Sequence, residues 1–210
     1  MITAEDFDRI RGAYGRHASW AVWGDPAGTV PVTADDLAFP AVTPELLQVL
    51  HVDLVTVGLN PGDGFASRDW ANFHTAAKSN DHVLGEALRG TPAWGAYMTD
   101  LLPAVIETRS ALVNPEQGAL TELIAEVTAA GNADPVFLAF GTKVRAILAD
   151  APSIIGRPVR MIPLTHYSGA ARGAVTKEYE RRFGPSTLPV SAKYAELVRV
   201  QIDEGLAAMT

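Results

Sequence analysis

Two short polar segments each follow a run of apolar residues, and their residue types could do chemistry. The first is Gly58–Gly62, with the sequence Gly-Leu-Asn-Pro-Gly, and the second is Pro163–Gly169, with the sequence Pro-Leu-Thr-His-Tyr-Ser-Gly. An asparagine such as Asn60 can orient a water through its side-chain carbonyl, and a histidine such as His166 can donate a hydrogen bond. Asn-Pro-Gly is also ordinary turn chemistry, and a lone histidine is more often structural. The pair is therefore informative only if the fold brings both segments to one place.

The elements that must position these segments follow from the hydrophobic pattern. Helical patterns separate four apolar runs that predict buried strands. The alternation predicts an α/β fold, a three-layer α/β/α sandwich with a short, mostly parallel central sheet. Ligands bind such sheets outside the carboxyl ends of the strands, where both polar segments fall. The predicted strands are Leu54–Leu59, Tyr97–Leu102, Val136–Phe140 and Arg160–Leu164.

Capping signals place the helices. Thr43-Pro44-Glu45 predicts a helix start, because it supplies an N-cap, a first-turn proline and a first-turn acid. Asn114-Pro115-Glu116 predicts a second start, with a helix that runs to about Ala130 and ends at Gly131-Asn132. Thr142 is expected to cap a helix through Asp150, and the N-terminal segment is expected to be helical to about Trp20. The apolar face predicted for a C-terminal helix consists of Tyr194, Leu197, Val198, Ile202 and Leu206.

The length of 210 residues fits one domain. We divide it into an N-terminal helical extension (1–43), a core that carries the motifs (44–185) and a C-terminal helix (186–210). Residues 24–36 are predicted to form a loop that separates the N-terminal helix from the core.

Composition excludes several classes of site. The chain has no cysteine, which removes disulfides, thiol catalysis, iron–sulfur clusters and cysteine-ligated zinc and fits a reducing cytoplasm. Its five histidines show no metal-ligand spacing, and no dinucleotide fingerprint, P-loop or nucleophile elbow is present. We therefore expect neither a cofactor nor a metal. The charged N-terminus does not resemble a signal peptide, and no apolar run is long enough to span a membrane.

Charge is unevenly distributed along the chain. The formal net charge is −7, but residues 141–193 hold 9 Lys and Arg against 3 Asp and Glu, a balance of +6. One interpretation is a solvated face, and the other is a local anion-binding surface on an acidic protein.

These segments, in this order, resemble the motifs of the uracil-DNA glycosylase superfamily, in its mismatch-specific, thymine-DNA-glycosylase-like branch. The segment "VGLNPG" at 57–62 is similar to the first motif, and "HYSG" at 166–169 is similar to the second, usually His-Pro-Ser. Between them, "AYMTDLL" at 96–102 stands where relatives have a strand that ends in a base-reading Asn. The segment "VFLAFGTKVRAIL" at 136–148 resembles the third strand and its helix, so that the resemblance covers about residues 44–185.

The resemblance implies a monofunctional DNA glycosylase, which hydrolyses the N-glycosidic bond of a damaged or deaminated base in DNA. Bond cleavage develops positive charge on the sugar and negative charge on the departing base. Asn60 would place the water, and His166 would donate to the oxygen of the base. The residues expected to bind the base are Gly58, Leu59, Pro61, Phe65, Phe73 and Asp100. The residues expected to contact the DNA backbone are Ser168, Arg172, Lys177, Arg181 and Arg182.

The chain departs from the family pattern at two positions. Tyr167 replaces the usual proline, and Asp100 stands where relatives carry the base-reading Asn. An ionised Asp only accepts hydrogen bonds, so we expect Asp100 to shift preference away from uracil, unless a raised pKa restores a donor. Alternatively Asp100 caps a helix or pairs with an arginine, and Phe73 is simply a core residue.

Two other functions fit the same residues. One is a non-catalytic module that binds nucleic acid or nucleotides on the same fold. The other is a hydrolase of free nucleosides or another small N-glycoside, which the acidic net charge would suit. The loop that follows His166 is rich in glycine and alanine and lacks a large apolar wedge, which does not favour strong intercalation into duplex DNA.

Overall fold

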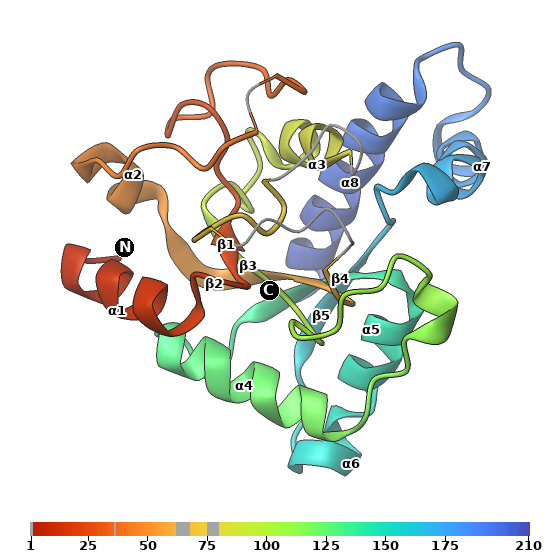
Figure 1. Ribbon diagram of the computed structural model, residues 1–210. Helices are drawn as coiled ribbons and strands as arrows, with labels where there is room; N and C mark the ends of the chain where they lie inside the picture. Colours follow the sequence, from red (N-terminus) through yellow and green to blue (C-terminus); the bar gives the residue numbers. More distant parts are fainter. Residues whose placement is uncertain (1, 36, 62–67, 75–79) are drawn as a thin grey trace.

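The computed structural model describes residues 2–35, 37–61, 68–74 and 80–210. Within these residues the chain forms an α/β fold around a five-stranded, mostly parallel sheet with the strand order β1-β3-β2-β4-β5 (Figure 1). The neighbours β3-β2, β2-β4 and β4-β5 pair in parallel, whereas β1 is antiparallel to β3. The strands are β1 (Ser19–Trp20), β2 (His51–Gly58), β3 (Ala96–Asp100), β4 (Val136–Phe140) and β5 (Arg160–Leu164).

The four predicted strands are confirmed, with β4 and β5 at the predicted bounds, but the N-terminal prediction is wrong beyond Tyr14. Helix α1 ends there, and Ser19 and Trp20 pair with Met98 and Tyr97 as an extra edge strand. Trp20 is fully buried against the core. Burial of this large aromatic side chain outweighs the local helical pattern, because removing apolar surface from water dominates the free energy of folding.

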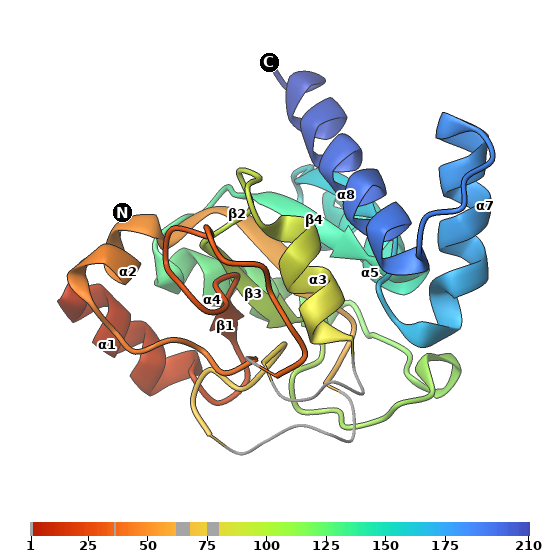
Figure 2. The ribbon, with the colours of Figure 1, turned by 90° about the horizontal axis from the view of Figure 1, so that it is seen from above.

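The helices flank the sheet on both faces, as Figures 1 and 2 show. Helices α1, α4, α5 and α6 lie on one side, and α3, α7 and α8 lie on the other. Their bounds are α1 (Ala4–Tyr14), α2 (Pro44–Val49), α3 (Asp81–Leu88), α4 (Gly118–Ala130), α5 (Gly141–Ala149), α6 (Ala151–Ile155), α7 (Arg172–Phe183) and α8 (Val190–Ala207). Two short 3₁₀ helices are η2 (Ser110–Leu112) and η3 (Gly169–Ala171).

The capping signals are confirmed at some helices and wrong at others. Thr43 caps α2 by accepting a hydrogen bond from the Leu46 N–H at 3.2 Å, and Gly131 ends α4 with a φ of +125°. Helix α4 begins at Gly118, three residues after Pro115, which belongs to the helix start predicted from the sequence. Thr142 does not cap α5, because that helix starts directly at Gly141, where β4 ends. The described part of the predicted loop, residues 24–35, has no helix or strand.

Alternate residues along the strands belong to two hydrophobic cores, one on each face of the sheet. Val55, Val57, Tyr97 and Phe137 pack with the helices on one face, and their neighbours along each strand pack with the helices on the other face. The predicted apolar face of the C-terminal helix is confirmed, with four of its residues buried and Leu206 packed at the edge. Parallel strands buried on both faces explain why these runs are apolar almost throughout.

The strand order creates one switch point. After β2 the chain turns to β3 on one side, whereas after β4 it turns to β5 on the other side. In open α/β sheets the crevice at such a point, outside the carboxyl ends of the strands, is the usual ligand site. Asn60 follows β2, which borders this crevice. Among the described residues, no helix is long and apolar enough to cross a membrane.

Candidate functional site

The fold brings Asn60 and His166 to the same edge of the sheet. They follow β2 and β5, whose parallel alignment with β4 puts all three carboxyl ends together. One strand separates β2 from β5, so the two strand ends lie roughly 10 Å apart, twice the spacing of neighbouring strands. His166 also reaches the end of β4, where its Cδ2 atom lies 3.9 Å from the position that a Cβ atom on Gly141 would take. The sequence prediction of a shared edge is therefore met by the topology.

The Asn60 side chain ties two loops together. Its Nδ2 atom lies 2.9 Å from the Pro61 carbonyl oxygen, 3.0 Å from that of Val105 and 2.8 Å from that of Glu107. The amide group thereby donates to the loop that follows β3, a role that the sequence did not indicate. These contacts use only the nitrogen, so Oδ1 is the atom that can accept a hydrogen bond from a water.

His166 is held in one tautomer. Its Nδ1 atom accepts a hydrogen bond of 3.0 Å from the Ser168 N–H, so in the neutral ring the proton lies on Nε2. Burial, and secondarily the charge of Arg145, lower the pKa of His166 below its usual range. The ring is half-buried and stacks on Tyr167, with 5.0 Å between centroids and 15° between planes. At neutral pH His166 is thus a neutral hydrogen-bond donor through Nε2.

Gly58, Asp100 and Phe73 meet at the ends of β2 and β3. Gly58 is the strand partner of Asp100, and a Cβ atom on Gly58 would lie 2.1 Å from Asp100 Oδ1 and 3.4 Å from Phe73 Cζ. Only glycine leaves room for the carboxyl group there. The backbone around it is fixed, because the Leu101 and Leu102 N–H groups donate to the Gly58 and Leu59 carbonyls at 2.9 Å.

The Asp100 carboxyl group is buried and close to half protonated at neutral pH. Burial raises its pKa from 3.8 to about 7, although the hydrogen bond from Asn72 Nδ2 to Asp100 Oδ2, at 2.8 Å, opposes this rise. The partner of Asp100 is thus an amide side chain. Among the described residues, Asp100 neither pairs with an arginine nor caps a helix, which were the two alternatives expected from the sequence. A group that is partly protonated both donates and accepts, as an asparagine does.

Phe73 is held in an unusual backbone conformation. It has a φ of +62°, and its carbonyl accepts a hydrogen bond from Trp23 Nε1 at 3.2 Å. A bulky residue in this region is strained, and such strain often accompanies function. Its side chain is buried in the core on the α3 side, with its ring tip toward Gly58. Leu59 and Pro61 flank Asn60 at the end of β2, whereas Phe65 lies outside the described residues.

The residues expected to contact the DNA backbone divide into two groups. Arg181 and Arg182, in the last turn of α7, both bind Glu178, and Arg182 also binds Glu204. Their charge is therefore largely balanced within the protein. Ser168 uses its backbone N–H on His166, while Arg172 and Lys177 are exposed and take part in no ion pair within the described part of the chain. Of the four basic residues, Arg172 lies nearest to His166 along the chain.

Sequence reasoning missed two residues that shape the site. Asn72 donates both to Asp100 and, at 2.8 Å, to the His17 carbonyl. Arg145 donates to the carbonyl of Leu164, the last residue of β5, which lies two residues before His166. The available signal for Asn72 was one polar residue between aromatic neighbours in "WANFH" at 70–74, and Arg145 gave none beyond its place in a helix. In the described ranges, no group of three or more His, Asp or Glu side chains could hold a metal ion.

Comparison with known proteins gives no relative. No protein-family model, no curated protein and no solved structure matches this chain.

Proposed function

We propose that this protein is a base-excision DNA glycosylase with the three-layer α/β/α sandwich of the uracil-DNA glycosylase superfamily. The observation that carries the proposal is the tautomer of His166. The Ser168 N–H occupies Nδ1, so the Nε2 proton is available to a ligand at the edge of the sheet where Asn60 also lies. A cytoplasmic location suits a chain without cysteine.

The reaction divides between the two residues. The C1′–N bond breaks with its electron pair going to the base, and the negative charge that appears on the base oxygen is stabilised by the Nε2–H of His166. A water that donates a hydrogen bond to Asn60 Oδ1 adds its oxygen to the sugar carbon. The proton it releases passes to the departing base or to solvent. An amide oxygen is a weak base, but an electron-deficient sugar carbon demands little from one.

Asp100 would read the base. With a pKa of about 7, its carboxyl group offers a donor and an acceptor when protonated and only acceptors when ionised. The protonated form matches the N3–H and O4 edge of uracil as a carboxamide would. The expected preference against uracil therefore applies to the ionised form, above neutral pH. Phe73 would form one wall of the same slot.

The test is a strand-cleavage assay on oligonucleotides that carry uracil, hypoxanthine, xanthine or mismatched thymine, with alkali to cut abasic sites. We expect excision of at least one base. Asn60→Ala should lose most turnover and keep DNA affinity, because water placement acts mainly in the transition state. His166→Ala should lower the rate by about 10²–10³-fold, the usual scale for one donor to an oxyanion.

A matched variant sharpens the His166 test. His166→Gln keeps an N–H donor without an imidazole, so it should retain more activity than His166→Ala. If the wild type excises no base from any of these oligonucleotides at high enzyme concentration, catalysis on DNA is excluded. DNA binding without excision would then identify a non-catalytic binding module.

A second candidate is a hydrolase of free nucleosides or other small N-glycosides. The pairing of Arg181 and Arg182 with Glu178 and Glu204 supports it, because it removes much of the positive charge expected to grip DNA. Release of the base from uridine, inosine and deoxyuridine, measured beside the oligonucleotide assay, separates the two. Turnover of nucleosides without turnover of oligonucleotides would favour this second candidate.

A further inference from the structure

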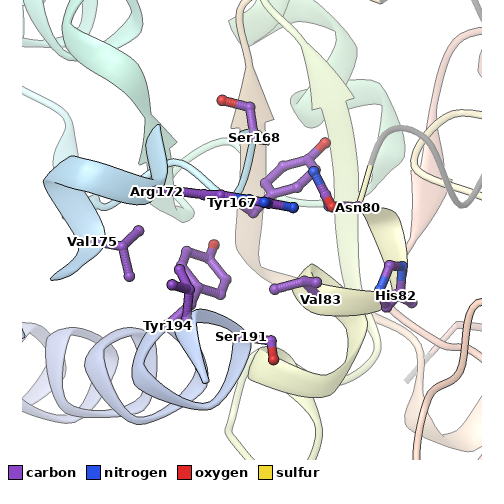
Figure 3. A pocket seen from close by; sticks show the side chains of 10 residues that line it. Asn80, His82, Val83, Tyr167, Ser168, Arg172, Val175, Ser191 and Tyr194 are labelled. Atoms are coloured by element: carbon purple, nitrogen blue, oxygen red, sulfur yellow. The ribbon is translucent and has the colours of Figure 1, made fainter. Parts of the chain in front are cut away.

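A cavity of about 350 Å³ lies beside the strand ends, between the start of α3, the start of α7 and the start of α8. It shares Tyr167 and Ser168 with the loop that carries His166, but its lining does not include Asn60 or Asp100. Figure 3 shows the side chains that surround it. This volume is within the range of pockets that bind small molecules.

A buried hydroxyl group points into this cavity. Tyr194 is 1% exposed, and Figure 3 shows its hydroxyl directed into the space below Tyr167. Within the described part of the chain this hydroxyl has no hydrogen-bond partner, nor does the buried Nδ1 atom of His82. A buried hydroxyl without a partner destabilises the folded protein, so a ligand that hydrogen-bonds to it recovers that free energy.

The lining carries a positive charge. Among the described residues that line the cavity, the basic side chains are Arg172 and His82, and no lining residue is acidic. Figure 3 shows the Arg172 side chain extending into the same space as Tyr167 and Asn80. A lining that presents an arginine and no carboxylate favours an anion over a cation, although the buried carboxylate of Asp81 also acts on Tyr167.

The rest of the lining is apolar or neutral. Val83, Val175 and Val190 join the two tyrosine rings, while Asn80 and Ser191 supply neutral polar groups. Valine and tyrosine surfaces of this kind suit a flat ring, and an amide and a hydroxyl suit polar atoms on its edge. The Ser168 side chain points away from the others in Figure 3, so we assign it no contact.

We propose that this cavity binds a small ring compound that carries an acidic group, either a phosphate or a carboxylate. The acidic group meets Arg172, the ring lies on the valine and tyrosine side chains, and a polar atom of the ligand bonds to the Tyr194 hydroxyl. The site is separate from Asn60 and Asp100 and does not depend on the glycosylase proposal. Because Tyr167 also stacks on His166, an occupant would contact the residue that supports that ring.

Calorimetric titration of the full chain tests the proposal with four probes: thymidine 5′-monophosphate, benzoate, thymidine and inorganic phosphate. The first two join a ring to an acid, and the last two each lack one part. We expect binding of at least one of the first two, about tenfold or more tighter than either thymidine or phosphate. Binding of one alone shows which of these two combinations of ring and acid the cavity accepts. The proposal would be overturned if neither ring acid gives binding heat at millimolar concentration, or if thymidine binds as tightly as thymidine 5′-monophosphate.

Three variants connect binding to the named residues. Arg172→Gln should weaken binding by about tenfold or more, because a charge-assisted hydrogen bond is lost. Lys177→Gln, on the same helix but outside the lining, should leave it unchanged. Asp100→Asn, measured above pH 7, changes the group proposed to read the base but lies outside the lining, so it should also bind as the wild type does, which separates this site from the proposed active site. If Arg172→Gln and Lys177→Gln bind the ligand with equal affinity, the ligand does not bind in this cavity.

Tyr194→Phe gives an independent test in the absence of any ligand. It removes only the unpartnered hydroxyl, so the melting temperature of the ligand-free protein should stay the same or rise, while affinity for the ligand falls several-fold. A clear fall in the ligand-free melting temperature would show that the hydroxyl already has a partner, which contradicts the proposal.

Discussion

The ends of β2 and β3 differ from the end of β5 in how tightly their polar groups are held. At β2 and β3, Asn60 binds the following loop through several carbonyls, and Asp100 lies against Gly58 with Asn72 bound to it. At β5, His166 is half-buried, holds one backbone hydrogen bond and borders a cavity through Tyr167.

This difference has a physical meaning for the proposed reaction. Groups that place a water or read a base must be fixed before the substrate arrives, and the β2–β3 end is built that way. The His166 side needs only a donor of the correct tautomer, which a single N–H can secure. We therefore expect substitutions at the first end to change stability as well as activity, and those at the second end to change activity with little effect on stability, and the following predictions test this contrast.

Gly58→Ala should have the largest effect. The new Cβ would overlap Asp100 Oδ1 at 2.1 Å, so the carboxyl group or the strand end must move. Overpacking of this kind costs about 1–3 kcal/mol or more in the free energy of unfolding, measured by chemical denaturation. Gly118→Ala is the control, because nothing lies within 4 Å of its Cβ position. In an Asp100→Ala background the cost should shrink, and an equal cost in both backgrounds would rule out the contact with Asp100.

Asp100→Asn should change how stability depends on pH. The pKa of Asp100 is about 7 in the folded state and 3.8 in the unfolded reference, so only the folded state binds this proton between those values. The free energy of unfolding of the wild type should therefore decrease as pH rises from about 4 to about 7. The variant should lack this component, so its stability relative to the wild type should rise over that window by at least about 1 kcal/mol.

Denaturation curves at several pH values provide the measurement for Asp100. A constant difference between wild type and Asp100→Asn across the window would mean that the folded state does not raise this pKa. In the oligonucleotide assay, the wild type should favour uracil more at pH values below 7 than above, while the variant should show no such change.

Ser168→Pro should reduce activity with little loss of stability. Ser168 has a φ of −61°, which proline accepts, but proline has no N–H to donate to His166 Nδ1. The imidazole can then take either tautomer, and we expect about a tenfold loss of rate, the equivalent of 1.4 kcal/mol. Ser168→Ala keeps the N–H and should behave as the wild type. Nitrogen NMR shifts of His166 should report mixed tautomers in the proline variant only, and unchanged shifts would contradict the assignment.

The basic residues of α7 should show the smallest effects. Arg172→Gln should reduce the dependence of DNA affinity on salt by about one released counterion, as for one lost phosphate contact. A double change of Arg181 and Arg182 to Gln should reduce it less, because Glu178 and Glu204 already balance those charges. DNA affinity measured at a series of salt concentrations tests this difference. A larger effect of the double change than of Arg172→Gln would indicate that the whole basic segment binds DNA.

Much of the fold was predictable because its signals are local. The apolar runs of β4 and β5 and the Thr43 cap depend on residues within one or two turns of each other. The start of α4 was misplaced by three residues, and the strand β1 was missed because distant packing decides it. Trp20, for example, is held by its contact with Tyr97, at 5.0 Å between ring centroids.

For the candidate site, the sequence by itself determined that Asn60 and His166 follow two parallel strands and that a glycine stands at position 58. Only the tertiary structure decided that Asn72 holds Asp100, 28 residues away, and that Glu204 balances Arg182, 22 residues away. It also decided that burial raises the pKa of the Asp100 carboxyl group to about 7. The reason is that strand and turn preferences arise between neighbours in the chain, whereas burial and choice of partner depend on which distant segments fold against each other.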